Sequence, residues 1–388
     1  MQTLSCRLCG HLETAVALVL PGSPRNIQNL LKTADLAKDS AVDLTVIQCK
    51  RCSFVQLPPV LEDTYYDDYL MGTTHSLQMQ KYQQRQAGDF VARFGLHDKK
   101  VFEAGCGDGS FSVHLQQAGA RVFGIEPSHR FRQLALAKGL AVEAGYVTAS
   151  RVLPQAPFDG FVTRQVLEHV PDIHDFLTGI RFNLADGAVG LIEVPSLEKA
   201  LADNRYYDFF ADHVNYFSLP TLALALQLNG FEIIETLHDM FGEYNVALVR
   251  AAQAPNLAGI QRTSTDLAAE LRLFVDSHHA KKQKVAVWGA GGKGLSVMAT
   301  AGIKHIDLMV DSDTFKQGMH TPVSHFLVQA PSPELLRGID AVIVTAMAYR
   351  AEIEATLRGP YAYTGTLAFL GQHLEVVPES RATERPLL

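Results

Sequence analysis

The segment from Lys100 to Ser128 constrains the fold most strongly, because it predicts a strand, a glycine turn, a helix and a second strand in direct succession. The first strand ends in Glu103. Three glycines then occupy every second position: Gly105, Gly107 and Gly109. Positions without a side chain allow a tight turn and let a ligand approach the main chain closely. The second strand ends in Glu126, about twenty residues beyond the turn, where a carboxylate is placed to accept hydrogen bonds from both hydroxyls of a ribose.

The spacing of these residues separates two kinds of nucleotide site. Dinucleotide sites prefer G-x-G-x-x-G, with a pyrophosphate at the N-terminus of the helix. The pattern here is E-x-G-x-G-x-G. Its first carboxylate, that of Glu103, would repel a pyrophosphate, but it suits the cationic amino group of an amino-acid moiety. The segment therefore resembles the S-adenosylmethionine (SAM) site of class I methyltransferases. An ordinary βαβ unit with a tight turn is the alternative.

The length and composition describe a globular protein of more than one domain. At 388 residues the chain is long enough for two or three domains. Its net charge of −7 argues against a nucleic-acid partner, because phosphate binding requires clustered Lys and Arg. No apolar run is long enough for a membrane span, and the N-terminus lacks the features of a signal peptide. We therefore expect a cytoplasmic monomer or small homo-oligomer that acts on a small molecule without membrane partners.

Four of the five cysteines form two C-x-x-C pairs: Cys6, Cys9, Cys49 and Cys52. In a reducing compartment this pattern predicts a zinc site with four thiolate ligands. The zinc is expected to be structural, because four thiolates leave no open position for catalysis. The pairs are about forty residues apart, more than in the commonest zinc ribbons, so the segment between them should have structure of its own. Two redox-active or disulfide-bonded pairs are the alternative.

Strands and helices continue to alternate after Glu126, which predicts an α/β sheet. One strand is expected over residues 160–163, and Gln165 and His169 follow its end. The ligand crevice of such a sheet lies beyond the carboxyl ends of its strands, so both side chains should face it. Gln165 is accordingly a candidate for cofactor binding. The tyrosine-rich segment 65–76 is expected to form either a lid or a loop that packs its aromatic side chains on the domain.

Three domains are expected: a zinc-binding module over 1–62, a SAM-binding methyltransferase domain over 63–254 and a Rossmann-like domain over 255–388. The last contains a second glycine pattern, G-x-G-x-x-G, at Gly289–Gly294, and Asp311 ends the following strand. This arrangement would permit NAD binding, but a lone pattern of this kind is weak evidence.

The chain as a whole resembles the sugar C-methyltransferases that act on nucleotide-linked 4-keto deoxysugars. Three runs carry the resemblance most specifically: HVNYFS at His213–Ser218, GAGGKG at Gly289–Gly294 and VDSDTFKQG at Val310–Gly318. The resemblance implies a class I methyltransferase sheet with a small N-terminal zinc module and a second Rossmann-like domain. It also implies SAM and structural zinc as cofactors, and a nucleotide-linked sugar as substrate. The C-terminal domain of this family is a Rossmann-like relic beside the active site, which favours a domain without NAD.

In this family a Tyr-x-Glu-His run lines the sugar site, and its histidine is the base. The matching run is made up of four residues: Phe210, Ala211, Asp212 and His213. His213 is retained, and Asp212 keeps the carboxylate with a reach one methylene shorter. Phe210 lacks the hydroxyl, whose role would be absent or taken by Tyr206, Tyr207 or Tyr216. His169 matches a histidine of the sugar site, so the resemblance implies His213, Asp212 and His169 as catalytic residues.

The implied reaction requires a base, because a carbon beside a ketone is a poor nucleophile until a proton is removed to give an enolate. Histidine suits this step, since its pKa lies near neutral. The enolate then attacks the SAM methyl group in line, and positioning supplies much of the rate. Three other functions stay open: a methyltransferase for another small molecule with a C, O or N acceptor, a zinc-knuckle module that binds RNA, and an NAD-dependent oxidoreductase. Purely structural roles for His213 and His169 also stay open.

Overall fold

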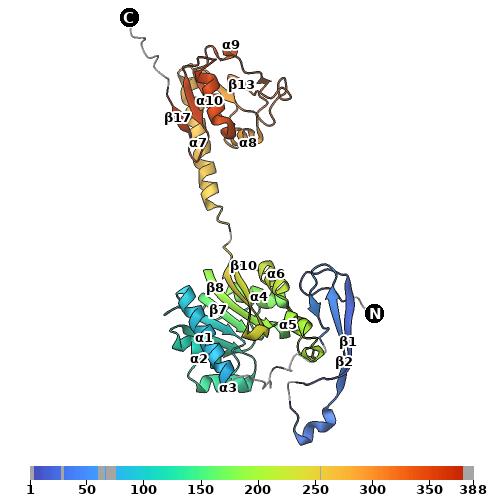
Figure 1. The fold of residues 1–388 in the computed structure, drawn as a ribbon. Helices are drawn as coiled ribbons and strands as arrows, with labels where there is room; N and C mark the ends of the chain where they lie inside the picture. Colours follow the sequence, from blue (N-terminus) through green and yellow to red (C-terminus); the bar gives the residue numbers. More distant parts are fainter. Residues whose placement is uncertain (1–3, 28–29, 60–65, 67–75, 254, 379–388) are drawn as a thin grey trace. The chain divides into compact units, whose positions relative to one another are not determined.

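The computed structural model describes residues 4–27, 30–59, 66, 76–253 and 255–378. The chain forms two compact units, Met1–Ala254 and Pro255–Leu388 (Figure 1). The first unit contains a four-stranded and a seven-stranded sheet, and the second contains a six-stranded sheet. Among the described residues, no helix combines the length and the apolar character needed to cross a bilayer.

The seven-stranded sheet has the strand order β10-β11-β8-β7-β4-β5-β6. Its strands are β4 (Lys100–Ala104), β5 (Arg121–Glu126), β6 (Ala141–Ala144), β7 (Phe158–Arg164), β8 (Leu184–Pro195), β10 (Phe231–Asp239) and β11 (Tyr244–Ala251). The strands from β8 to β6 pair in parallel, whereas β11 is antiparallel to both β8 and β10. The predicted α/β sheet of a class I methyltransferase is confirmed, and β10 and β11 form an antiparallel hairpin at its end.

Helices cover both faces of this sheet (Figure 1). They are α1 (Leu77–Phe94), α2 (Ser110–Gln117), α3 (His129–Ala137), α4 (Ile173–Phe182), α5 (Leu197–Ala202) and α6 (Leu219–Leu228), with short 3-10 turns η3 (Leu167–His169), η4 (Tyr206–Asp208) and η5 (Met240–Gly242). Successive side chains of a strand point to opposite faces. Val101 accordingly lies in a buried cluster with Phe90 of α1 and Leu115 of α2. Phe102 lies in the opposite cluster with Ile180 of α4.

The four-stranded sheet of the first unit joins the N-terminal region to a distant part of the chain. Its order is β1-β2-β3-β9, and all its strand pairs are antiparallel. The strands are β1 (Thr14–Pro24), β2 (Ala41–Cys49), β3 (Val55–Gln56) and β9 (Asn215–Tyr216), and η1 (Thr33–Lys38) lies between β1 and β2. The segment between the two cysteine pairs therefore has structure of its own, as expected. Strand β9 begins two residues after His213 and places that residue next to the N-terminal sheet.

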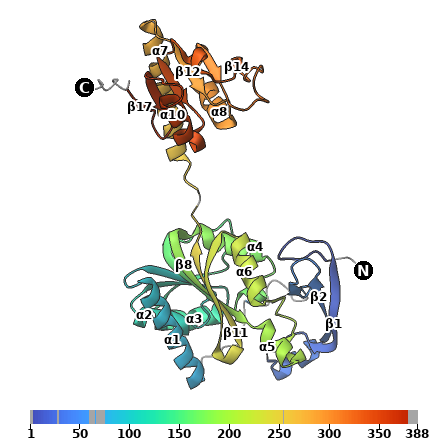
Figure 2. The ribbon, with the colours of Figure 1, turned by 45° about the horizontal axis from the view of Figure 1, so that its top comes forward.

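The second unit is a smaller Rossmann-like domain (Figure 2). Its sheet order is β14-β13-β12-β15-β16-β17, in which only β17 pairs antiparallel among the described strands. The strands are β12 (Val285–Trp288), β13 (Leu308–Val310), β14 (Val328–Gln329), β15 (Ala341–Val344), β16 (Thr366–Phe369) and β17 (Glu375–Val377). The helices are α7 (Ala258–Ala280), α8 (Gly292–Thr300), α9 (Pro333–Leu336) and α10 (Arg350–Arg358), with η6 (Met347–Tyr349). The prediction of a second Rossmann-like domain is confirmed.

The glycine pattern of this second domain forms the turn between β12 and α8. The carboxylate of Asp311 accepts hydrogen bonds from the Ala290 N–H at 2.6 Å and from Lys316 Nζ at 3.1 Å. A Cβ on Gly289 or Gly294 would lie within 3 Å of Thr345 Oγ1, so close packing requires glycine at both positions. Close packing thus explains why glycine occupies these two positions, and hydrogen bonds within the domain occupy the carboxylate of Asp311. Neither observation requires a bound ligand.

Candidate functional site

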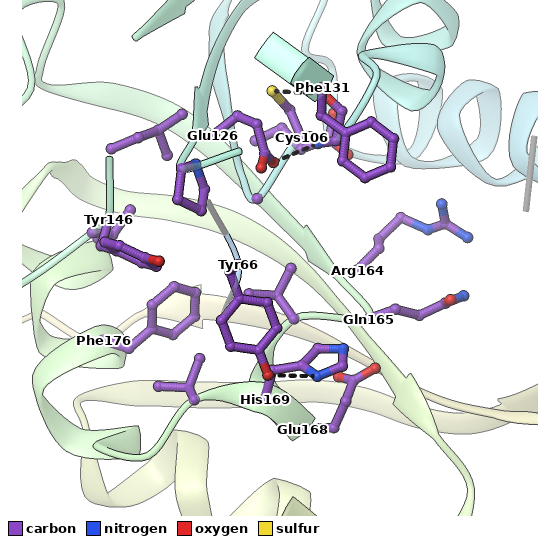
Figure 3. Close-up of a pocket in the computed structure, with 18 of the residues that line it drawn as sticks. Tyr66, Cys106, Glu126, Phe131, Tyr146, Arg164, Gln165, Glu168, His169 and Phe176 are labelled. Carbon is purple, nitrogen blue, oxygen red and sulfur yellow. Dashed lines mark hydrogen bonds between the residues drawn. The ribbon is translucent and has the colours of Figure 1, made fainter. Parts of the chain in front are cut away.

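A cavity of about 1010 Å³ lies at the carboxyl ends of β4, β5 and β7 in the first unit. The glycine turn and Glu126 line one part of it, and His169, Asp212 and His213 line another. Figure 3 shows Glu126, Cys106 and Phe131 at one end and His169 beside Tyr66 at the other. The cavity therefore brings together the candidate catalytic residues and, except for Gly109, the candidate cofactor residues of the SAM pattern.

Glycine is required at the three positions of the turn for different structural reasons. A Cβ on Gly105 would lie 2.5 Å from Val166 Cγ2, and one on Gly109 would lie 2.2 Å from Leu140 Cδ1. Gly107 has φ +53, and a Cβ there would meet nothing within 4 Å. Because Gly107 also lines the cavity, its backbone stays open for close approach by a ligand. Close packing therefore requires glycine at positions 105 and 109, and between them the main chain at Gly107 is open to the cavity.

The two carboxylates of the turn are both buried but hold different groups. Glu126 accepts hydrogen bonds from the N–H groups of Gly107 and Ser128, each at 2.8 Å, one on each carboxylate oxygen. Each oxygen keeps a further acceptor position, so Glu126 can still bind the hydroxyls of a ribose. Glu103 accepts a hydrogen bond from Ser112 Oγ at 2.5 Å, and burial raises its pKa to about 7. A cationic ligand group beside Glu103 would favour its ionised form.

The remaining walls near the turn also fit SAM, although the sequence interpretation singled out only Gln165 among them. Aromatic side chains line the cavity around Glu126: Phe131, Tyr146 and Phe176 (Figure 3). Such apolar surfaces suit an adenine ring. Gln165 lines the cavity at the end of β7 and donates to Glu193 Oε1 at 3.2 Å. Its backbone has φ +54, an uncommon conformation for a residue with a side chain.

Two further polar residues of the cavity were missed by the sequence interpretation. Gln83 lies on the buried face of α1, and its Oε1 has no hydrogen-bond partner among the described residues. Arg164 donates from Nη2 to Glu193 at 2.6 Å, while its Nε is likewise without a partner in the described part of the chain. Both side chains line the cavity and are available to polar groups of a ligand. The signal that could have found Gln83 is a polar residue on the buried face of α1, and Arg164, the last residue of β7, carries no such signal.

His169 and His213 are in direct contact. Their ring centroids lie 4.6 Å apart at an interplanar angle of 80°. Nδ1 of His169 lies 3.0 Å from the Asp212 carbonyl oxygen, and because a carbonyl only accepts, Nδ1 carries the proton and Nε2 the lone pair. The ring of Phe210 lies 4.1 Å from that of His213. The imidazole of His213 makes no hydrogen bond within the described part of the chain, so its nitrogens are available to a ligand.

Burial governs the protonation of this cluster. It lowers the pKa of His169 to about 4 and that of His213 well below its usual range, so both rings are neutral at neutral pH. It raises the pKa of Asp212 to about 7. Neither carboxylate oxygen of Asp212 has a hydrogen-bond partner among the described residues, and Oδ2 lies 3.7 Å from His169 Nδ1. An unpaired buried carboxylate this close to the imidazole of His169 favours a positive charge that forms on that ring.

Tyr66 contributes a hydroxyl that the sequence interpretation did not assign individually. Its oxygen lies 3.2 Å from His169 Nδ1 and donates to the Asp212 carbonyl at 3.1 Å (Figure 3). Apart from Tyr66 and Ser76, the predicted lid segment 65–76 lies outside the described residues. Of the three tyrosines considered as replacements for the hydroxyl missing at Phe210, none lines the cavity: Tyr206, Tyr207 and Tyr216. Tyr66 is the tyrosine whose hydroxyl lies beside the histidines.

The four paired cysteines converge on one point. Their sulfur atoms all lie within 4.8 Å of one another, with Cys6 Sγ 3.6 Å from Cys52 Sγ and Cys9 Sγ 3.7 Å from Cys49 Sγ. Four sulfurs held at about 2.3 Å from one tetrahedral ion would lie about 3.8 Å apart. All four thiols are free, and the N–H of Cys9 points to Cys6 Sγ at 3.5 Å. The cluster therefore has the ligands and spacing that a structural zinc ion requires.

The sheet, the E-x-G-x-G-x-G turn and the carboxylate at Glu126 define a class I SAM-dependent methyltransferase. Residues 79–236 match a methyltransferase domain family, and residues 250–370 match the C-methyltransferase C-terminal domain. The C-methyltransferase NovU of Streptomyces niveus is 30% identical over 384 residues, and the alignment covers 90% of each chain. The chain belongs to the C-methyltransferase family and is a SAM-dependent C-methyltransferase.

More local similarity extends to other methyltransferases. The ubiquinone biosynthesis O-methyltransferase of Pseudomonas aeruginosa strain UCBPP-PA14 is 40% identical over 86 residues, which cover 21% of this chain and 37% of that protein. The structure of magnesium protoporphyrin IX methyltransferase from Synechocystis matches with 18% identity and a TM-score of 0.38, over 48% of this chain and 91% of the other.

Replacing Glu126 by alanine is expected to weaken SAM binding about tenfold to a hundredfold, because hydrogen bonds to a charged acceptor contribute about 1.5–3 kcal/mol. Calorimetric titration with SAM measures the change directly. Glu232→Ala is the matched control, because Glu232 is exposed on β10 and does not line the cavity. Unchanged SAM affinity in Glu126→Ala would show that this carboxylate holds only the turn.

Proposed function

We propose that the protein methylates the carbon next to the ketone of a nucleotide-linked 4-keto deoxysugar, with His213 as the general base. The observation that carries the proposal is the cavity shared by the glycine turn and His213. The imidazole of His213 is neutral and makes no hydrogen bond to the described residues. We further propose that Cys6, Cys9, Cys49 and Cys52 bind a structural zinc ion.

His213 is neutral at neutral pH and so has a lone pair that can take a proton from carbon. Burial places its pKa below the near-neutral value expected from the sequence and so lowers its basicity. In the proposed step, the C–H bond beside the ketone breaks, the proton moves to an imidazole nitrogen of His213, and the electron pair becomes that of the enolate. The positive charge then formed on His213 is stabilised by the carboxylate of Asp212, which is the preceding residue and lines the same cavity. SAM, when bound at the glycine turn, supplies the electrophilic methyl group that the enolate carbon accepts.

The polar groups of the catalytic end support a hydroxylated acceptor. Glu168 is buried, and its Oε2 has no hydrogen-bond partner among the described residues. Together with Asp212 and Tyr66 it offers acceptor and donor atoms to sugar hydroxyls and to the ketone oxygen. Phe210, in place of the family's tyrosine, packs its ring 4.1 Å from that of His213 and does not line the cavity. The similarity to the family of sugar C-methyltransferases supports the same substrate class.

Exchange of solvent deuterium into the acceptor tests whether the protein removes the proton beside the ketone, independently of methyl transfer. We expect the wild-type protein, without SAM, to exchange the proton beside the ketone of a nucleotide-linked 4-keto-6-deoxyhexose in D2O, as followed by NMR. The same sugar with a reduced ketone is the control and should not exchange. Methylation of an O or N acceptor needs no such proton removal, so methyl transfer to a non-sugar compound with no exchange into any 4-keto sugar would contradict the proposal.

A further inference from the structure

We propose that the first cysteine knuckle, residues Cys6–Cys9, positions the two histidines of the active site through the side chain of Arg7. Arg7 lies between Cys6 and Cys9, whereas His169 and His213 come from distant parts of the chain. Arg7 is therefore a positioning residue, and the N-terminal module is part of the catalytic machinery rather than an appendage. This inference rests on the proposed function of His213 as the base.

The guanidinium of Arg7 connects the knuckle to the segment that follows His213. Its Nη1 donates to the Val214 carbonyl at 2.7 Å and to Asn215 Oδ1 at 2.9 Å, and its Nη2 donates to the Leu57 carbonyl at 2.8 Å. Three oxygen atoms from two segments of the chain thus accept hydrogen bonds from the one planar guanidinium group of Arg7. A lysine presents a single ammonium group and cannot reproduce this geometry.

The main chain of Arg7 is itself held in place. Its N–H donates to Gln56 Oε1 at 2.8 Å, and Gln56 Nε2 donates to the Ser5 carbonyl at 3.0 Å. Gln56 belongs to β3, which pairs with β9 through Gln56 and Asn215. The knuckle, β3 and β9 therefore form one hydrogen-bonded block, and the position of Arg7 within it is determined at both its backbone and its side chain.

Asn215 extends this block to the turn that carries His169. Its Nδ2 donates to the carbonyls of Leu167 at 2.8 Å and Val170 at 2.7 Å, on either side of His169. The Val214 N–H donates to the Glu168 carbonyl at 2.9 Å. Arg7 orients the side chain of Asn215 by occupying its oxygen, so that the amide group faces η3. The cysteine knuckle therefore helps to hold the two histidine rings in contact, through the hydrogen bonds of Arg7 and Asn215.

Loss of the Arg7 guanidinium would remove the donors to the Leu57 carbonyl and to Asn215 Oδ1 and free Asn215 to rotate. The Val214 carbonyl would keep its hydrogen bond from the Leu57 N–H at 2.9 Å. Displacements of about 1 Å at reacting groups cost up to about a hundredfold in rate. We therefore expect Arg7→Gln to reduce kcat about tenfold to a hundredfold, with zinc content and SAM affinity unchanged. Arg7→Lys should recover little of this loss, and deuterium exchange into the acceptor should fall in parallel with kcat.

The second knuckle offers the matched control. Arg51 lies between Cys49 and Cys52, and its side chain is exposed. Arg51→Gln should leave kcat, zinc content and SAM affinity at wild-type values. Asn215→Ala removes the link to η3 without altering the knuckle, and it should reproduce the loss in kcat seen with Arg7→Gln while keeping zinc.

A readout without any acceptor separates this inference from the proposed function. Amide hydrogen exchange should accelerate at Leu167–Val170 and at Val214–Asn215 in Arg7→Gln, even if His213 proves not to be the base. Wild-type kcat with unchanged amide protection in Arg7→Gln would overturn the inference. So would loss of zinc in parallel with activity, because Arg7 would then act by holding the metal site. Wild-type kcat in Asn215→Ala would overturn the link to His169.

Discussion

Replacing His213 by alanine is expected to abolish methyl transfer while leaving SAM affinity unchanged. A positioned general base contributes about 10²–10⁴-fold to the rate, so transfer should fall by about this factor even though the imidazole of His169 remains in the cavity. SAM affinity should persist, because the glycine turn and Glu126 line a different part of the cavity. Single-turnover transfer measures the first effect, and calorimetric titration with SAM measures the second.

The control for this substitution is His97→Ala. His97 is exposed and precedes β4, so it lies at the amino end of the strand, away from the cavity at the carboxyl ends. This variant should keep wild-type transfer and SAM affinity. Full transfer in His213→Ala would exclude His213 as the base. Loss of SAM binding together with transfer would instead assign His213 to the cofactor site or to the fold.

Replacing Cys49 by serine is expected to remove the bound zinc and unfold the N-terminal sheet. A structural zinc site with four thiolates contributes about 10–16 kcal/mol in small zinc-binding peptides, far more than the other contacts of so small a module can replace. Cys49 is also the last residue of β2, so the loss reaches β3 and, through its pairing, β9. We expect loss of zinc by mass spectrometry or metal analysis, and methyl transfer below detection.

Two controls show whether this loss is confined to the first unit. Cys106→Ser removes the fifth cysteine, which lies in the glycine turn, and should keep stoichiometric zinc. Trp288 is the single tryptophan of the chain and lies in β12 of the second unit. Because each unit is compact by itself, the unfolding transition of Trp288 fluorescence should keep its midpoint in Cys49→Ser. Retention of zinc in this variant would contradict a four-cysteine site.

The local features of the chain were predictable because their causes are local. Helix α1, for example, spans residues 77–94 because Ser76 caps its first turn and Gly95 ends it in the left-handed conformation. The glycine turn was predictable for the same reason, since the spacing of Gly105, Gly107 and Gly109 reflects backbone needs at those positions. The partner of each carboxylate was not predictable, because the Gly107 and Ser128 N–H groups are placed on Glu126 only by the completed turn.

The catalytic end of the cavity depended on resemblance and then on tertiary contacts. Residues alone did not distinguish a buried structural role for His213 from a catalytic one. The structure adds that His169 and His213 touch and that the carboxylate of Asp212 is buried without a hydrogen-bond partner among the described residues. It also places the Tyr66 hydroxyl beside His169 Nδ1 and the Asp212 carbonyl. Tyr66 carried no signal beyond its place in a tyrosine-rich segment, because His169, the candidate catalytic residue that its hydroxyl contacts, is 103 positions further along the chain.

By itself, the amino-acid sequence determined the SAM turn, the cysteine cluster and the succession of strands and helices, because backbone conformation, ligand type and hydrophobic period act over a few residues. Only the tertiary structure decided that the cysteine knuckle and the histidines belong to one hydrogen-bonded block. Arg7 and Val214 are 207 positions apart, and their contact depends on β9 pairing with β3. No local pattern encodes such a pairing, since it is selected by the packing of the whole first unit.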